Sequence, residues 1–181
     1  MNLAKIDQSS FTPTDIETSY ILHEFGHVLG FHHEHQSPSR ARVLTFNREN
    51  ILEHYRNQDC PWSRKDIKQN IINVLKDKQI SNYSLFDPNS IMMYPIEESY
   101  TEQEIVIPRN TQLSELDKAY AMVHYPRQRP HKRAPEWTIS HALDVIGVHG
   151  ILRGQILRTR DPEKIRDLFT RWNAAERSKK V

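Results

Sequence analysis

Three histidines near the start of the chain have a spacing that suits a metal site. His23 and His27 are four residues apart, so on an α-helix they lie one turn apart on the same face, where two imidazoles can bind one cation. Gly30 can adopt the left-handed conformation that ends a helix and turns the chain, which allows His33 to return as a third ligand. The pattern predicts a zinc site of three imidazoles, with Glu24 beside it as general base.

The alternative interpretation of these histidines is a solvated polar stripe or an accident of composition. The chain contains ten histidines, so some clustering is expected by chance. Five positions fixed together by type and spacing favour the metal site, because such a set arises by chance only about once in ten million windows. His32 and His35 do not fit the ligand spacing, and we expect them at the surface or in support of the ligands.

The helix that must carry the first two histidines is predicted over residues 14–30. It begins with a capping box, in which Thr14 caps the first turn and Glu17 reaches back. Its histidines should face a cleft, and the opposite side should face a core. The apolar residues of that opposite side are Ile21, Leu22, Phe25, Val28 and Leu29.

Two separated motifs carry a resemblance to a known family. Residues 23–33 match HExxHxxGxxH, which resembles the extended signature of the metzincin zinc endopeptidases, and the following Glu34 is similar to the astacin branch. Residues 90–94, Ser-Ile-Met-Met-Tyr, resemble the Met-turn of that family. The resemblance covers about residues 14–126. It implies an α+β, zincin-like catalytic domain, present mostly as its helical active-site and C-terminal part.

The resemblance also implies a function and a set of site residues. One catalytic Zn²⁺ would be bound by His23, His27 and His33, with no other cofactor. The enzyme would be a zinc metalloendopeptidase that cleaves proteins or peptides through a zinc-bound water activated by Glu24. Tyr94 would be a fifth zinc contact that swings away to hydrogen-bond the oxyanion. Ser90 and Met92 would form the structural Met-turn, although Met92 taken alone would be read as core filling.

The chain departs from the family at its N-terminus. Only 22 residues precede His23, so most of the N-terminal subdomain, with the strand that aligns the substrate, is expected to be missing. The apolar side of the zinc helix then lacks its partner, and either the tail covers it or the chain is incomplete. Glu34, which in the family contacts the N-terminus of the trimmed enzyme, loses that role. The alternative function is therefore a catalytically inactive zinc-binding remnant or truncated pseudoenzyme.

Charge divides the chain into two regions. The first 126 residues carry 12 basic and 17 acidic side chains, a net charge of −5, whereas the last 55 carry 13 and 6, a net charge of +7. We expect a peptidase domain over 1–126, a basic proline-containing linker over 127–136, and a basic helical extension over 137–181. Further helices are expected over 47–55, from Ser63, over 114–125 and from Asp161.

Partners and location follow from composition and from the resemblance. No apolar run is long enough to span a membrane, and we expect the amphipathic tail to dock on the peptidase part rather than to bind nucleic acid or a lipid surface. Cys60 is the single cysteine, so no internal disulfide can form. The family resemblance implies a secreted protein, although residues 1–20 contain no apolar signal segment and Asn82-Tyr83-Ser84 is weak support as a glycosylation acceptor. The sequence defines neither the oligomeric state nor the cleavage preference.

Overall fold

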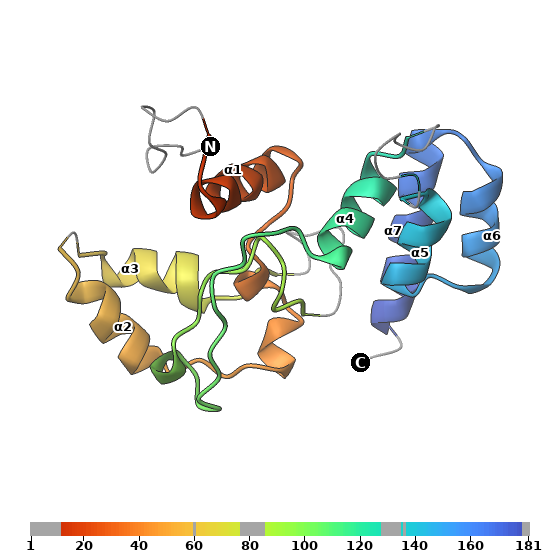
Figure 1. Ribbon diagram of the computed structural model, residues 1–181. Coiled ribbons are helices and arrows are strands. Elements are labelled where there is room, and N and C mark those ends of the chain that lie inside the picture. The colour runs from red at the N-terminus through yellow and green to blue at the C-terminus, as the bar shows by residue number, and fades with distance from the viewer. Residues whose placement is uncertain (1–11, 60, 77–85, 128–134, 136, 179–181) are drawn as a thin grey trace. The chain divides into compact units, whose positions relative to one another are not determined.

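The computed structural model describes residues 12–59, 61–76, 86–127, 135 and 137–178 (Figure 1). Contacts divide the chain into two compact units, Met1–Gln112 and Leu113–Val181, which are described separately below. The expectations for Cys60, for the acceptor at Asn82 and for most of the linker fall outside the described residues.

The first unit is built from short helices joined by long loops (Figure 1). The helices are α1 (Asp15–Val28), η1 (Glu34–Gln36), η2 (Arg40–Arg42), α2 (Arg48–Arg56), α3 (Arg64–Ile67), η3 (Lys68–Ile72) and η5 (Glu98–Tyr100). The described residues of this unit also contain two isolated antiparallel bridges, which join Phe46 to Thr101 and Ile96 to Ile107. The helical part of the expected α+β class is therefore present, whereas the described residues form no extended sheet.

Helix α1 begins after its predicted cap, Thr14, and ends at Val28, two residues before the predicted end at residue 30. The Oγ1 atom of Thr14 accepts a hydrogen bond from the N–H of Glu17 at 3.2 Å, and Oε2 of Glu17 accepts one from the N–H of Thr14 at 2.8 Å. This reciprocal pair is the predicted capping box. Gly30 follows the helix with a φ of +84°, in the left-handed region that glycine adopts without a steric penalty.

The side that α1 buries is not the one predicted. Phe25 and Val28 on the expected core side are 52% and 62% exposed. The buried positions of the middle of the helix are instead Ser19 and Gly26, and Gly26 lies against Met92. The exposure of Phe25 and Val28 agrees with the expectation that this apolar side lacks its partner. The small residues Ser19 and Gly26 allow another segment of the unit to approach the helix closely on a different side.

The apolar core of the first unit lies among α2, the α3–η3 segment and the loop after residue 90. Its buried members are Leu44, Phe46, Ile51, Leu52, Ile67, Ile71, Ile72, Met93, Ile96, Tyr100 and Ile107. Arg40 is also buried, and its guanidinium donates hydrogen bonds to the carbonyl oxygens of His35, Leu44 and Ile72 at 2.9, 3.3 and 2.9 Å. These carbonyl bonds satisfy the buried cation and fix the turn that follows the histidines.

The second unit is a cluster of four helices. They are α4 (Glu115–His124), α5 (Ile139–Ile146), α6 (Gly150–Arg158) and α7 (Pro162–Ser178), among the described residues. The buried core consists of Ala119, Val123, Ala142, Leu143, Val148, Ile156, Ile165, Leu168 and Phe169. The predicted starts of α4 and α7 are confirmed, since Ser114 caps α4 and Oδ1 of Asp161 accepts the N–H of Glu163 at 2.9 Å.

Helix α4 packs with the C-terminal helices rather than standing apart from them. It packs on α5 and also contacts α7. The sequence places this helix at the end of the peptidase domain, before the linker. The boundaries proposed from charge, at 126 and 136, stay predictions. Among the described helices, none has the length and apolar content needed to cross a bilayer.

Candidate metal centre

The three predicted ligands come together at the end of α1. His23 and His27 project from the helix, and the turn at Gly30 returns His33 to them, so that one nitrogen of each ring lies within 4.8 Å of the others. The ring centroids of His27 and His33 are 4.6 Å apart, and those of His23 and His27 are 4.9 Å apart. The structure thus forms a group of three imidazoles that could hold one ion.

Hydrogen bonds define which nitrogen of two of these rings is free for a metal. Nδ1 of His23 lies 2.8 Å from the carbonyl oxygen of Ile91, and Nδ1 of His27 lies 2.9 Å from that of Phe31. A carbonyl oxygen can only accept, so each Nδ1 carries the proton. Nε2 is then the nitrogen of each ring that can bind a metal, as in histidines that are oriented by a second partner. Nε2 of His27 lies 3.1 Å from Nε2 of His33, so these two nitrogens already face each other.

The surroundings favour the neutral form of His23 and His33. Burial, helped by the neighbouring histidines 35, 27 and 23, lowers the pKa of His33 to about 3. Burial also lowers the pKa of His23. Neutral nitrogen ligands in a set of three suit Zn²⁺ and leave a fourth position open. The donor set therefore fits the predicted ion.

The predicted Met-turn, residues 90–94, is held by its own hydrogen bonds and by a distant asparagine. Oγ of Ser90 accepts the N–H of Met92 at 3.0 Å. Nδ2 of Asn110 donates to the carbonyl oxygens of Pro88 and Ser90 at 2.8 and 2.9 Å. Met92 is 2% exposed. Sequence reasoning missed Asn110, because no local pattern links it to a turn some 20 residues away.

Tyr94 lies beside the histidines. Its ring centroid is 4.4 Å from that of His33 and 5.9 Å from that of His23. Burial raises the pKa of the Tyr94 phenol, and the negative charge of Glu24 raises it further. The phenol thus keeps its proton at neutral pH and can donate a hydrogen bond into the site.

His35 supports the site rather than lying at the surface. It is fully buried, its ring stacks on that of His33 at 5.3 Å, and its Nε2 lies 2.9 Å from the carbonyl oxygen of Asn70. The ring centroid of Tyr94 is 4.5 Å away. His32, in contrast, is exposed. Two roles are expected for these histidines from the sequence. His35 fits the role of supporting the ligands, and His32 fits a position at the surface.

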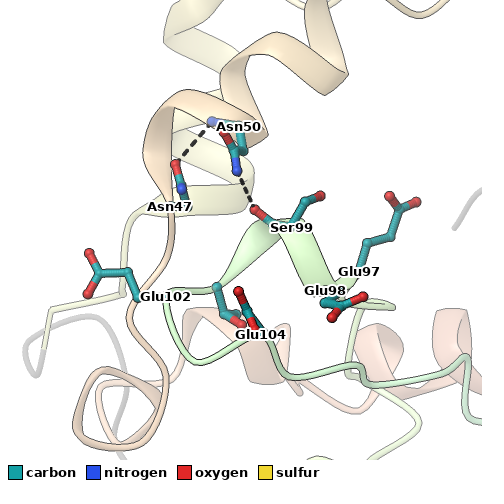
Figure 2. Close-up of a pocket in the computed structure, with 8 residues that line it drawn as sticks. Asn47, Asn50, Glu97, Glu98, Ser99, Glu102 and Glu104 are labelled. Carbon is teal, nitrogen blue, oxygen red and sulfur yellow. Dashed lines mark hydrogen bonds between the residues drawn. The ribbon is translucent and has the colours of Figure 1, made fainter.

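An acidic hollow of about 600 Å³ is a separate feature of the first unit (Figure 2). Its lining residues are Asn47, Asn50, Glu97, Glu98, Ser99, Thr101, Glu102 and Glu104. Nδ2 of Asn50 donates to the carbonyl oxygen of Ser99 at 2.8 Å across it (Figure 2). Among the described residues that line the hollow there is no histidine, so the hollow is separate from the three candidate ligands.

Comparison with known proteins identifies one family, a similar curated protein and similar solved structures. The model of the Astacin peptidase family matches residues 8–121. Over 82 residues the chain is 37% identical to Astacin-like metalloprotease toxin 4 of Loxosceles laeta, and the match covers 45% of this chain and 58% of the toxin. A solved structure of myroilysin is similar with a TM-score of 0.60 and 32% identity, over 67% of this chain and 57% of that one. The chain thus spans somewhat more than half the length of these relatives.

Proposed function

Since the chain belongs to the astacin family of peptidases, we propose that it is a zinc-dependent endopeptidase that hydrolyses peptide bonds in proteins or peptides. The observation that carries the proposal is the group of three histidine nitrogens within 4.8 Å of one another. The carbonyl partners of His23 and His27 support it, because they leave the Nε2 lone pairs available.

In this proposal His23, His27 and His33 hold one Zn²⁺. When bound, the ion would polarise the scissile carbonyl and lower the pKa of a water molecule to about 7. The lowered pKa values of His23 and His33 support this assignment, because a protonated imidazole cannot bind a cation. The low pKa of His33, about 3, keeps this ligand available over the whole neutral range.

Glu24 and Tyr94 supply the proton transfer and the oxyanion contact. Glu24 is adjacent to His23 in the sequence, and its negative charge raises the pKa of both His23 and Tyr94. It accepts a proton from the attacking water and passes it to the leaving amine. The protonated phenol of Tyr94 donates a hydrogen bond to the oxygen on which negative charge develops.

The alternative is a zinc-binding protein without peptidase activity. It is favoured by the exposed apolar side of α1, where Phe25 and Val28 are 52% and 62% exposed. It is also favoured because the described residues contain isolated bridges rather than a sheet whose edge could align a substrate. In this alternative the three histidines bind the ion, and no extended substrate is oriented over it.

Hydrolysis of casein by the chain separates the two functions. Three samples are compared, namely the parent with zinc, the parent after chelation and the Glu24→Ala variant with zinc. Zinc content is measured in all three. Cleavage by the first sample alone supports the peptidase. Stoichiometric zinc in the parent without cleavage supports the inactive zinc-binding protein. A parent that binds no zinc contradicts both.

We further propose that the protein is secreted. The support is the family resemblance and the relative from Loxosceles laeta, whose name describes a toxin. Expression of the gene in its own cells, followed by detection of the protein in the medium and in the cell pellet, tests the proposal. Protein found only in the pellet would contradict it.

A further inference from the structure

Glu34 makes two contacts with residues 87–92, a segment that includes the start of the predicted Met-turn. Its N–H donates to the carbonyl oxygen of Met92 at 3.0 Å, and its Oε1 accepts the N–H of Asp87 at 3.0 Å. The family resemblance would assign this carboxylate to the N-terminus of a trimmed enzyme. In this structure the carboxylate accepts a hydrogen bond from a backbone N–H of the same unit. Glu34 is the first residue of η1 and is partly buried.

The same segment also supports the other side of the metal centre. The carbonyl oxygen of Ile91 accepts the hydrogen bond from Nδ1 of His23 at 2.8 Å. Glu34 directly follows His33 in the chain. Residues 87–92 therefore connect the first and third ligands, because they bond to one ring directly and to the residue beside the other.

We propose that Glu34 is a positioning residue, whose carboxylate holds His33 at ligand distance by accepting the N–H of Asp87. The inference rests on the proposed zinc function. Glu34 has one hydrogen bond at its backbone N–H and one at its side-chain carboxylate. The two bonds together restrict rotation of the residue next to His33 more than the backbone bond does by itself. Partners of this kind commonly change metal affinity by about 10- to 100-fold when they are removed.

Reach and charge can be separated at this position. Glu34→Gln keeps an oxygen at the same distance from the backbone and removes the charge. Glu34→Asp keeps the charge and shortens the side chain by one methylene, so its oxygen no longer reaches the N–H of Asp87. Glu53→Asp, at an exposed position of α2, is the matched control for the shortening.

Two measurements test the proposal. The first is zinc affinity, determined by competition with a chromophoric chelator, and the second is the visible spectrum of the cobalt-substituted protein. We expect Glu34→Gln and Glu53→Asp to bind zinc within about twofold of the parent, and Glu34→Asp to bind at least about tenfold more weakly with an altered cobalt spectrum. Parent-like binding by Glu34→Asp would overturn the proposal. Equal weakening of the Gln and Asp variants would also overturn it, because charge rather than reach would then matter.

A second pair of variants applies if Glu34→Asp does not fold, as judged by circular dichroism of the zinc-free protein. Asp87→Pro removes the N–H donor, whereas Asp87→Ala keeps it, and both lose the bond from the N–H of Asn89 to the Asp87 carboxylate. We expect the proline variant to bind zinc at least about tenfold more weakly than the alanine variant, and equal affinities overturn the proposal. A parent that binds no zinc would instead refute the proposed function.

Discussion

Gly26 of α1 lies so close to Met92 of the Met-turn that a Cβ atom at Gly26 would overlap the methionine sulfur. Gly26 is on the same helix as His23 and His27, and Met92 is 2% exposed. The absence of a side chain at Gly26 therefore sets the distance between the metal-site helix and the Met-turn. The close approach lets the carbonyl oxygen of Ile91, beside Met92, reach His23.

Replacement of Gly26 by alanine should destabilise the first unit. We expect Gly26→Ala to lower the free energy of unfolding by about 1–3 kcal/mol, because the added methyl overpacks the contact with Met92. In a Met92→Ala background the same replacement should cost clearly less, since the overlapping sulfur is gone. Urea unfolding of the four proteins, with zinc removed, gives the coupling between the two positions. An equal cost in both backgrounds would show that the two residues do not compete for space.

Removal of the Tyr94 hydroxyl should slow turnover without loss of zinc. We expect Tyr94→Phe to lower kcat by about 10- to 1,000-fold, because one hydrogen bond to the oxyanion is lost. Zinc affinity should change little, since the ring and its packing on His33 remain. Tyr55→Phe is the matched control, as Tyr55 is another half-buried tyrosine of the same unit. Unchanged kcat in Tyr94→Phe would contradict the proposed role of the phenol.

Local features of the metal-site helix can be predicted from the sequence, and its burial cannot. The cap at Thr14, the turn at Gly30 and the histidine spacing depend on residues three to seven positions apart, where helix geometry is fixed. The buried side of α1 depends on Met92, and the shape of the Met-turn depends on Asn110. Such contacts join residues far apart in the chain, and periodicity contains no information about them.

In the second unit, too, some helices can be predicted from the sequence and others depend on tertiary packing. The sequence predicts helix α7, because Asp161 and Pro162 mark its start and its apolar residues recur on one side. It predicts a helical extension over 137–181 but not the separate helices α5 and α6 within it. Helix α5 has 8 residues, which is short for a periodic pattern, and α6 begins after His149 with no side-chain cap. Both helices depend on tertiary packing around Leu143 and Ile156, which are fully buried.

Acid should destabilise the zinc-free protein through His35. Burial lowers the pKa of His35 to about 4, below the ordinary value of 6.5 that it regains on unfolding. Between these values only the unfolded chain takes up the proton, so stability is fully present above about pH 6.5 and is lost as the pH falls toward 4. From about pH 7 to about pH 5 the loss from this residue is on the order of 2 kcal/mol.

Replacement of His35 by glutamine tests this pH dependence. Gln does not titrate and can still donate to the carbonyl oxygen of Asn70, the partner of His35 in the structure. We expect Glu34 and the rest of the turn to keep their bonds, and the decrease in the free energy of unfolding between about pH 7 and pH 5 to be smaller in His35→Gln than in the parent. Urea unfolding of the parent and of His35→Gln at the two pH values, with a chelator present, measures this decrease in each protein. The same decrease in the two proteins would assign the acid sensitivity to other groups.

Two glycines of the second unit should respond to alanine with opposite signs. Gly147 ends α5 with a φ of +82°, where any residue with a Cβ is strained, so Gly147→Ala should lower the free energy of unfolding by about 1 kcal/mol. Gly154 lies inside α6, has no positive φ, and a Cβ there meets nothing within 4 Å. Gly154→Ala should therefore raise the free energy of unfolding by up to about 1 kcal/mol, because alanine is the better helix former. Thermal and urea unfolding, followed by circular dichroism, compare the two variants with the parent, and destabilisation by Gly154→Ala would contradict the open space beside α6.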